Sequence, residues 1–325
     1  MPTLLETLEF SSIVEVTSSG LSSEGDKDAT QPHSPYNPQS THRRKVFHSW
    51  LKIGRETDYD LESNIVGKQT LDIGCGQGDM IELFAATLKA QGNQSSRVVG
   101  VDPASLDYGE PWTLGDAQAG LLAGPVGEYL SFRQTTAPAL VASQPTGTYS
   151  VAYFAHSLYY FPSYATIIQN FKSLLNAGVQ TLLLAEWSLS ISDLAALPHL
   201  LAVLLQSIDP ISDGNVRTVL SPAAYMTAAM EAGWEVASSE TFAPVAGLED
   251  GKWETGFART VAEKTAIGRQ AVQTVERSVE SVQRESLTAH ADALEASIVS
   301  AGGVDRVRCM DVWTAIFRPA ASKTA

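Results

Sequence analysis

A glycine-rich segment with an acid before it is the part of the chain whose residue types and spacing best suit chemistry. Asp72 is followed by a glycine at every second position, Gly74, Gly76 and Gly78. Such a loop turns tightly and lets a ligand lie against bare backbone. Residues 70–73 read as a short strand, and the apolar positions after the loop recur at helical spacing. Strand, glycine loop and helix together predict a nucleotide-binding unit.

The spacing of the glycines indicates which kind of nucleotide is bound. A dinucleotide site uses G-x-G-x-x-G, with the pyrophosphate at the helix N-terminus. Here the third glycine comes one residue early, and Asp72 would repel a pyrophosphate but suit an ammonium group. A second acid, Asp102, ends the predicted strand 97–101 and could accept hydrogen bonds from both ribose hydroxyls. These features favour a ligand that carries an ammonium group over one that carries a diphosphate.

The segment Asp72-x-Gly74-x-Gly76-x-Gly78 after a strand resembles the first motif of class I S-adenosylmethionine (SAM) methyltransferases. In these families the end of the fourth strand passes the methyl group, and an aspartate after the third strand often binds the adenine. This chain has threonines in place of that aspartate. The resemblance implies SAM as cofactor, bound by Asp72, Gly74, Cys75, Gly76, Gly78, Asp102, Pro103, Thr135, Thr136, Phe154, Ala155 and His156.

The alternation of apolar runs and helical patterns predicts an α/β fold. The expected strands are 70–73, 97–101, 129–133, 150–155, 179–186, 234–242 and 310–317. The fifth is continuously apolar, as expected of a central parallel strand covered on both faces. The resemblance adds a Rossmann-like, seven-stranded, mostly parallel sheet with helices on both faces, whose last two strands form an antiparallel pair.

Three regions differ in composition. Residues 1–40 are polar and read as a flexible arm with a possible short strand at 12–16. The methyltransferase domain is expected over 41–325, with a first helix near Thr41. A helical cap insertion is predicted over 243–303, where apolar positions in 251–300 recur at helical spacing. We expect one long helix, or a hairpin broken near Ser286, that acts as a substrate lid, as a homodimer interface or as passive packing.

Methyl transfer from SAM depends mainly on alignment, and a hydroxyl acceptor also benefits from a nearby base. His156, directly after the fourth strand, is the best-placed base by the resemblance, although it could instead pack against the cofactor. His48 on the first helix is the second catalytic candidate. His199 and His290 could reach the pocket from above, and His33 and His42 are expected in solvent. Five aromatic residues are predicted to form the substrate-binding wall: Tyr159, Tyr160, Trp187, Trp253 and Phe257.

Composition restricts the possible partners. The net charge of -14 and a pI near 4.8 argue against nucleic acid as a partner. Cys75 and Cys309 give no disulfide framework, which fits a reducing compartment. No targeting signal is visible, and no apolar run approaches the ~20 residues of a membrane span. We therefore expect a cytoplasmic protein with a small-molecule substrate, no membrane partner and no metal.

The general character of the chain is similar to fungal small-molecule methyltransferases of alkaloid pathways, of the glandicoline B O-methyltransferase type. That similarity implies O-methylation of a hydroxyl on an indole-alkaloid-like metabolite. The alternatives are an N- or C-methyltransferase, a SAM-binding regulatory protein without activity, and an NAD-dependent oxidoreductase. The glycine spacing, Asp72 and the lack of a Tyr-x-x-x-Lys pair count against the oxidoreductase.

Overall fold

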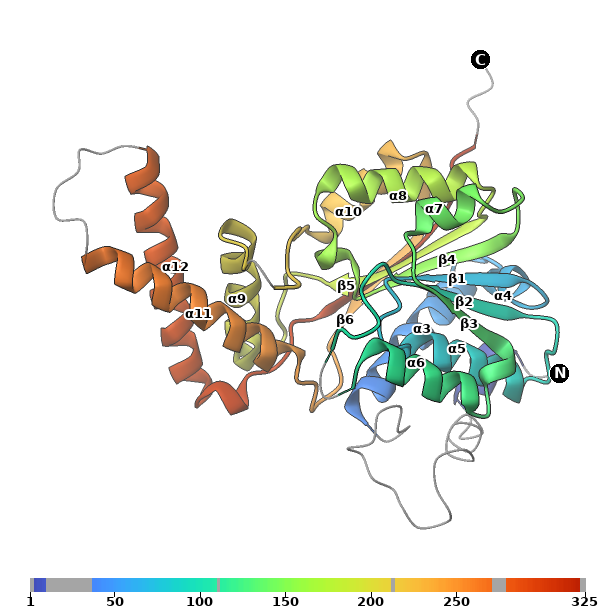
Figure 1. The fold of residues 1–325 in the computed structure, drawn as a ribbon, viewed down its shortest axis with the longest axis horizontal. Helices are drawn as coiled ribbons and strands as arrows, with labels where there is room; N and C mark the ends of the chain where they lie inside the picture. The colour runs from blue at the N-terminus through green and yellow to red at the C-terminus, as the bar shows by residue number, and fades with distance from the viewer. Residues whose placement is uncertain (1–2, 10–36, 110–111, 212–213, 271–278, 322–325) are drawn as a thin grey trace, which may run out of the picture.

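A seven-stranded sheet forms the centre of the molecule (Figure 1). The computed structural model describes residues 3–9, 37–109, 112–211, 214–270 and 279–321. The strand order is β3-β2-β1-β4-β5-β7-β6, and only β7 runs antiparallel to its neighbours β5 and β6. The strands are β1 (Gln69–Ile73), β2 (Arg97–Val101), β3 (Leu130–Arg133), β4 (Tyr149–Ala155), β5 (Thr181–Trp187), β6 (Trp234–Phe242) and β7 (Val312–Pro319). The predicted Rossmann-like methyltransferase fold is thereby confirmed.

Helices cover both faces of the sheet (Figure 1). One face carries α3 (Pro38–Glu56), α5 (Asp79–Ala90) and α6 (Leu114–Ala123), and the other carries α7 (Ala137–Ala142), α8 (Tyr164–Asn176) and α10 (Pro222–Glu231). The shorter elements are α4 (Leu61–Ile65), η1 (Gly127–Tyr129), η2 (Leu158–Tyr160), η3 (Leu194–Ala196) and η4 (Val304–Arg306). Because β1 to β5 run parallel, their carboxyl ends lie at one edge of the sheet, where ligands bind in folds of this class.

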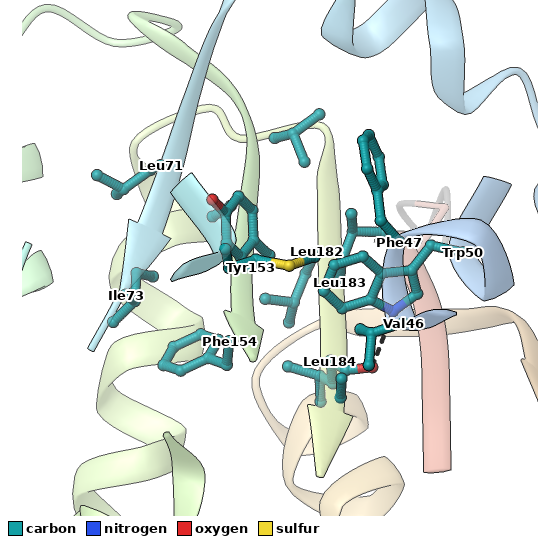
Figure 2. Close-up of a cluster of buried hydrophobic side chains, with 14 of the residues drawn as sticks. Val46, Phe47, Trp50, Leu71, Ile73, Tyr153, Phe154, Leu182, Leu183 and Leu184 are labelled. Carbon is teal, nitrogen blue, oxygen red and sulfur yellow. Dashed lines mark hydrogen bonds between the residues drawn. The ribbon is translucent and has the colours of Figure 1, made fainter. Parts of the chain in front are cut away.

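Apolar side chains of α3 fix this helix to the sheet (Figure 2). Val46, Phe47 and Trp50 are at most 1% exposed, and the Trp50 indole Nε1–H donates to the carbonyl oxygen of Leu184 at 3.0 Å. The ring of Phe47 stacks on that of Phe84, with centroids 3.9 Å apart. Burial of several large side chains on one helix contributes on the order of 1.5–3 kcal/mol each. The helix is therefore held firmly enough to position side chains on its first turns.

The start of α3 differs from the sequence prediction. The sequence predicts a first helix near Thr41, but the helix begins at Pro38 and Asn37 caps it: the Asn37 Oδ1 accepts from the N–H groups of Gln39 and Ser40. Pro38 occupies the first turn, where its missing N–H costs nothing. The helix thus begins three residues before the predicted domain boundary, which places His42 inside its second turn.

The first residues of the predicted flexible arm are ordered. Residues Leu4–Glu9 form helix α1, in which Leu4, Leu5 and Leu8 are buried against the main core. Three leucines within one short helix supply enough apolar surface to dock it, so the prediction of a flexible arm is wrong at its start. The possible strand at 12–16 lies outside the described residues.

Three helices extend beyond the sheet as a separate unit, which we call the cap (Figure 1). They are α9 (Leu197–Ile208), α11 (Asp250–Gln270) and α12 (Val279–Ala301). Their shared core contains Ala202 and Leu205 of α9, Ala258 of α11 and Leu294 of α12. The predicted break near Ser286 is wrong, because α12 runs through that residue and no glycine or proline interrupts it there. The contribution of α9, from between β5 and β6, was not predicted.

Candidate active site

The glycine loop after β1 adopts backbone conformations that favour glycine. Gly74, Gly76 and Gly78 have φ angles of +72°, +52° and +103°. A side chain at Gly74 would begin 2.6 Å from the Ser157 Cβ, so this glycine is needed for packing. A Cβ at Gly76 would meet nothing within 4 Å. Gly76 therefore borders open space in which a ligand can lie directly on the backbone.

Asp102 joins the end of β2 to this loop. Its Oδ2 accepts from the Gly76 N–H at 3.0 Å, and its Oδ1 accepts from the Ala104 N–H at 2.9 Å. A carboxylate oxygen can accept a second hydrogen bond, so both oxygens keep capacity for a diol. The side chain is half-buried beside the open space at Gly76, whereas the neighbouring Pro103 is exposed.

Asp72 is buried within β1, with 2% of its surface exposed. Burial raises its pKa to about 8, although the neighbouring Tyr153 acts in the opposite direction. Its Oδ2 has no hydrogen-bond partner among the described residues. A buried carboxyl group with an unused oxygen is costly unless a partner arrives. Asp72 therefore suits a ligand that brings a hydrogen-bonding cation.

Four other residues predicted to bind the cofactor lie in the glycine loop, at the end of β4 or after β3. Cys75 lies against Gly100, and Ala155 is half-buried at the end of β4. Thr136 caps α7, accepting from the Ala139 N–H, and Thr135 beside it is half-buried.

The side chain of Phe154 does not reach this site. Its ring lies among Phe161 and Phe171, in the core between β4 and α8. Side chains alternate along a strand, so Tyr153 faces Asp72 while Phe154 faces the opposite side of the sheet. Of Phe154, which was predicted to bind the cofactor, the ring is therefore part of the core, and only its backbone lies at the end of β4.

His156 occupies a strained position directly after β4. Its φ of +56° is uncommon for a residue other than glycine, and such strain is often found at functional sites. Its N–H donates to the carbonyl oxygen of Ala185, which ties it to the end of β5. Its Nδ1 lies 3.4 Å from Oε1 of Glu186. Burial lowers its pKa well below the usual value, so the imidazole is neutral.

Glu186 is held rigidly behind His156. Its Oε2 accepts from the N–H groups of Leu158 and Tyr159, and its Oε1 accepts from the N–H of Trp187. Burial raises its pKa to about 7, and the three backbone donors oppose that shift. The sequence analysis missed this residue. The available signal was an acid near the carboxyl end of an otherwise apolar strand.

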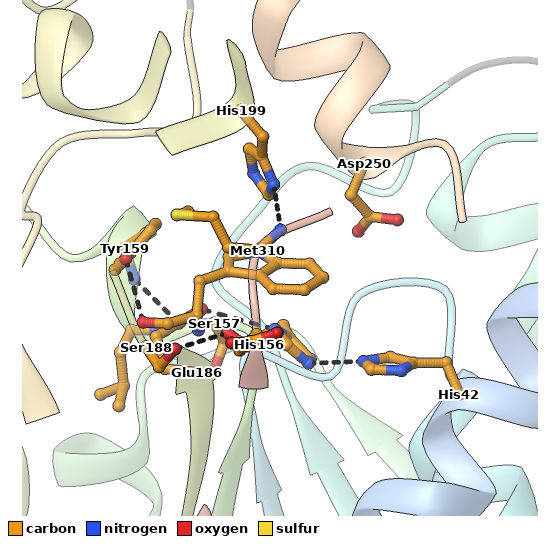
Figure 3. A network of polar contacts seen from close by, with 12 residues as sticks. His42, His156, Ser157, Tyr159, Glu186, Ser188, His199, Asp250 and Met310 are labelled. Carbon is orange, nitrogen blue, oxygen red and sulfur yellow. Dashed lines mark hydrogen bonds and ion pairs between the residues drawn. The ribbon is translucent and has the colours of Figure 1, made fainter. Parts of the chain in front are cut away.

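Two further buried histidines complete the cluster (Figure 3). His42 Nε2 lies 3.0 Å from His156 Nε2, and the His42 ring stacks on Trp187. His199 of α9 packs edge-on against Trp187 and accepts from the Met310 N–H through Nδ1. Burial lowers the pKa of both, to about 3 for His199. The prediction that His42 lies in solvent is wrong, because His42 lies on the same face of α3 as the buried Val46 and Trp50.

A small cavity of about 20 Å³ lies beside His156. Its lining contains three residues of the predicted substrate wall and three acids: Tyr159, Tyr160, Trp187, Glu186, Asp250 and Glu254. Trp253 and Phe257 of α11 are each about half exposed and do not line it. His48 is half-buried on α3 and does not line it either.

Comparison with known proteins identifies the family. Residues 42–239 match the methyltransferase domain family. The chain belongs to this methyltransferase family. Methyltransferase phomM' of Diaporthe leptostromiformis is 31% identical over 287 residues, covering 75% of this chain and 72% of that protein. Methyltransferase phomM of the same organism is 30% identical over 296 residues, with the same coverage.

Solved structures share the fold. A cyclopropane-fatty-acyl-phospholipid synthase-like protein from Lactobacillus casei superposes with a TM-score of 0.68 at 23% identity, covering 94% of this methyltransferase and 97% of that chain. Loganic acid methyltransferase with SAH superposes with a TM-score of 0.50 at 9% identity, covering 93% and 99%. No helix in the described part of the methyltransferase is long and apolar enough to cross a membrane.

The cofactor of this methyltransferase is SAM, and the residues present fit it. The open space over Gly76 and the unused oxygen of Asp72 meet the needs of a nucleoside that carries an ammonium group. A further charged residue, Arg43 of α3, lowers the pKa of Asp72 and Glu186 without forming an ion pair with the described residues.

Proposed function

We propose that this SAM-dependent methyltransferase methylates a hydroxyl group on a small planar acceptor, of the kind found in indole alkaloids. The observation that carries the proposal is the Glu186–His156–His42 series at the carboxyl ends of β4 and β5. Neutral imidazoles backed by a carboxylate form the usual apparatus for removing a proton from a hydroxyl. The adjoining rings of Tyr159, Tyr160 and Trp187 suit a planar heterocycle.

The cofactor's binding residues are proposed from the same geometry. Asp102 would accept hydrogen bonds from the ribose hydroxyls, and Asp72 and Arg43 would hold the ammonium and carboxylate groups. Thr135 would lie near the adenine. SAM, when bound, supplies an activated methyl group, so the protein needs chiefly to align the acceptor and remove its proton.

The histidine pair would receive the proton of the acceptor. Glu186 beside Nδ1 favours the tautomer of His156 that carries hydrogen there, which leaves its Nε2 to accept from His42 Nε2–H. His42 Nδ1 then has no partner among the described residues and offers a free lone pair to an acceptor proton. A proton taken there passes through the pair, and the ionised Glu186 stabilises the resulting positive charge.

A turnover assay tests this proposal. The full chain is incubated with labelled SAM and three matched acceptors: an N-hydroxyindole, a phenol of similar size and an indole with neither group. Methyl transfer to oxygen, located by NMR of the product, would support the proposal. Transfer to nitrogen or carbon would replace it with the alternative reactions. Tight SAM binding without turnover on any acceptor would favour a regulatory protein.

The relatives support methyl transfer as the reaction. Both phomM proteins are from a fungus and are called methyltransferases, which agrees with the proposed type of reaction. The narrower assignment to an indole-alkaloid hydroxyl depends on the aromatic lining of the cavity and on the resemblance drawn from the sequence.

A further inference from the structure

The cap places two acids beside the proposed catalytic residues. Asp250 and Glu254 are four residues apart on α11, one turn of the same helix face, and both line the cavity next to Glu186. Figure 3 shows Asp250 at the start of its helix, directed toward the cluster. Both lie beyond residue 239, where the match to the methyltransferase domain family ends. They are features of this chain's cap and not of the matched domain.

These acids are oriented by amide donors and are not paired with a basic side chain. The Gln206 side-chain amide donates to Glu254 Oε2 at 2.9 Å, and the Gln39 amide donates to Asp250 Oδ2. Amide donors fix a carboxylate without cancelling its charge. Within the described ranges, no lysine or arginine reaches ion-pair distance of Asp250, Glu254 or Glu186.

Mutual repulsion and burial act on the group. Burial raises the pKa of Glu254 to about 7, and the charges of Asp250 and Glu186 contribute to that shift. Burial also raises the pKa of Asp250, while Arg43 of α3 opposes the shift. His156 lines the same cavity and is 93% buried; its Nδ1 lies 3.4 Å from Glu186 Oε1 and makes no hydrogen bond with the described residues. The cavity therefore brings together three acids that no described lysine or arginine pairs with, and it suits a positively charged group.

The geometry favours an organic cation over a metal ion. Among the described residues, no group of three or more His, Cys, Asp or Glu side chains is arranged to hold a metal. The cavity of about 20 Å³ holds a group of roughly water size, as a protonated amine is. The rings of Tyr160 and Trp187 border it and can stabilise a cation through their faces.

We propose that Asp250, Glu254 and Glu186 form a subsite for a protonated nitrogen of the acceptor. The subsite rests on the proposed function in one respect, that the cavity receives the acceptor. The planar body of the acceptor would extend outward past Tyr160, toward the half-exposed Trp253, which precedes Glu254 on α11. The cap would thereby select basic acceptors, while His156 and His42 act on the hydroxyl.

Binding measurements test the subsite without requiring turnover. Three indoles of similar shape are titrated into the full chain at saturating S-adenosylhomocysteine: cationic tryptamine, neutral tryptophol and anionic indole-3-propionate. We expect tryptamine to bind at least about tenfold more tightly than either, as a hydrogen bond between charged groups implies. Equal affinities, or no detectable tryptamine binding at millimolar concentration, would overturn the proposal.

Matched variants separate the subsite from general electrostatics. Glu254→Gln and Asp250→Asn should each weaken tryptamine binding by about tenfold and leave tryptophol unchanged. Glu249→Gln removes an exposed carboxylate beside α11 and should change neither ligand. If Glu249→Gln weakens tryptamine as much as Glu254→Gln does, the preference is only long-range attraction. Selective tryptamine binding without O-methylation of any acceptor would refute the proposed reaction and keep the subsite. O-methylation without a preference for cationic ligands would refute the subsite and keep the proposed reaction.

Discussion

His42 and His156, 114 residues apart in the sequence, contact each other through their Nε2 atoms at 3.0 Å. Two neutral imidazoles can share this contact only if one donates and the other accepts. Neither ring is protonated near neutral pH, because burial lowers the pKa of both well below the usual value. The pair is therefore a neutral, directional unit at the carboxyl end of the sheet, and its chemistry depends on Glu186 behind it.

Loss of His156 should lower turnover. His156→Ala should decrease kcat by about 10²-fold or more while SAM affinity stays nearly unchanged. His156→Asn is the matched control for backbone strain, since asparagine tolerates the φ of +56°. Equal losses in both variants identify the imidazole as the cause. For an N-hydroxyl or enol acceptor the loss should shrink as pH rises. If the His156→Ala variant keeps parental turnover from pH 6 to 9, His156 does not act as a general base.

The pH dependence of turnover should report Glu186. Its pKa of about 7 means that the ionised form, which stabilises a protonated imidazole, increases as pH rises through 7. We expect kcat to increase across this range and then level off, and Glu186→Gln to have low kcat without that step. A parental profile that stays flat from pH 6 to 8 with a non-ionising acceptor would contradict the role of Glu186.

His42 and His156 should be coupled. His42→Asn should lower kcat, and the double variant with His156→Asn should be little worse than either single one, because both changes break the same proton path. His48→Asn, on the same helix but away from the cavity, is the control and should keep parental kcat. Additive losses in the double variant would show that the two histidines act separately.

Asp102 should control cofactor affinity. Asp102→Ala removes two hydrogen bonds to a charged acceptor, which should cost roughly 2–4 kcal/mol of SAM binding by calorimetry. Asp102 also holds the Gly76 N–H, so Asp102→Asn is needed as a variant that keeps the shape of the side chain. Unchanged affinity in the alanine variant would remove the ribose assignment.

Gly76 should be sensitive because of the space above it. Gly76→Val should impair SAM binding in a folded protein, since its side chain would enter the open space next to the loop. Gly92 supplies the control: it has a φ of +74° and equally free surroundings, and it follows the C-terminus of α5, at the opposite end of this helix from the glycine loop. Gly92→Val carries the same kind of backbone strain and should bind SAM normally. Similar loss in both variants would indicate strain and not ligand space.

The sequence by itself determined the glycine loop after β1 and the acid after β2. The spacing of Asp72, Gly74, Gly76 and Gly78 is local, and a strand followed by such a loop has few ways to fold. Asp102 was also identifiable, because the residue that ends a parallel strand must lie at the same sheet edge as the loop. Strand β2 matches its predicted range because an apolar run bounded by polar turns specifies a strand locally. Strand β6 also matches its predicted range, although its residues are largely polar.

Only the tertiary structure decided which residues surround the cavity beside His156. His42 shares the buried face of α3 with Trp50, but it meets His156 only because that face packs against the end of the sheet, which no local pattern specifies. Asp250 and Glu254 reach Glu186 only because α11 packs on α9, a helix from another part of the chain. Long-range packing of this kind depends on side-chain fit across elements, whereas periodicity reports only which face of one element is apolar.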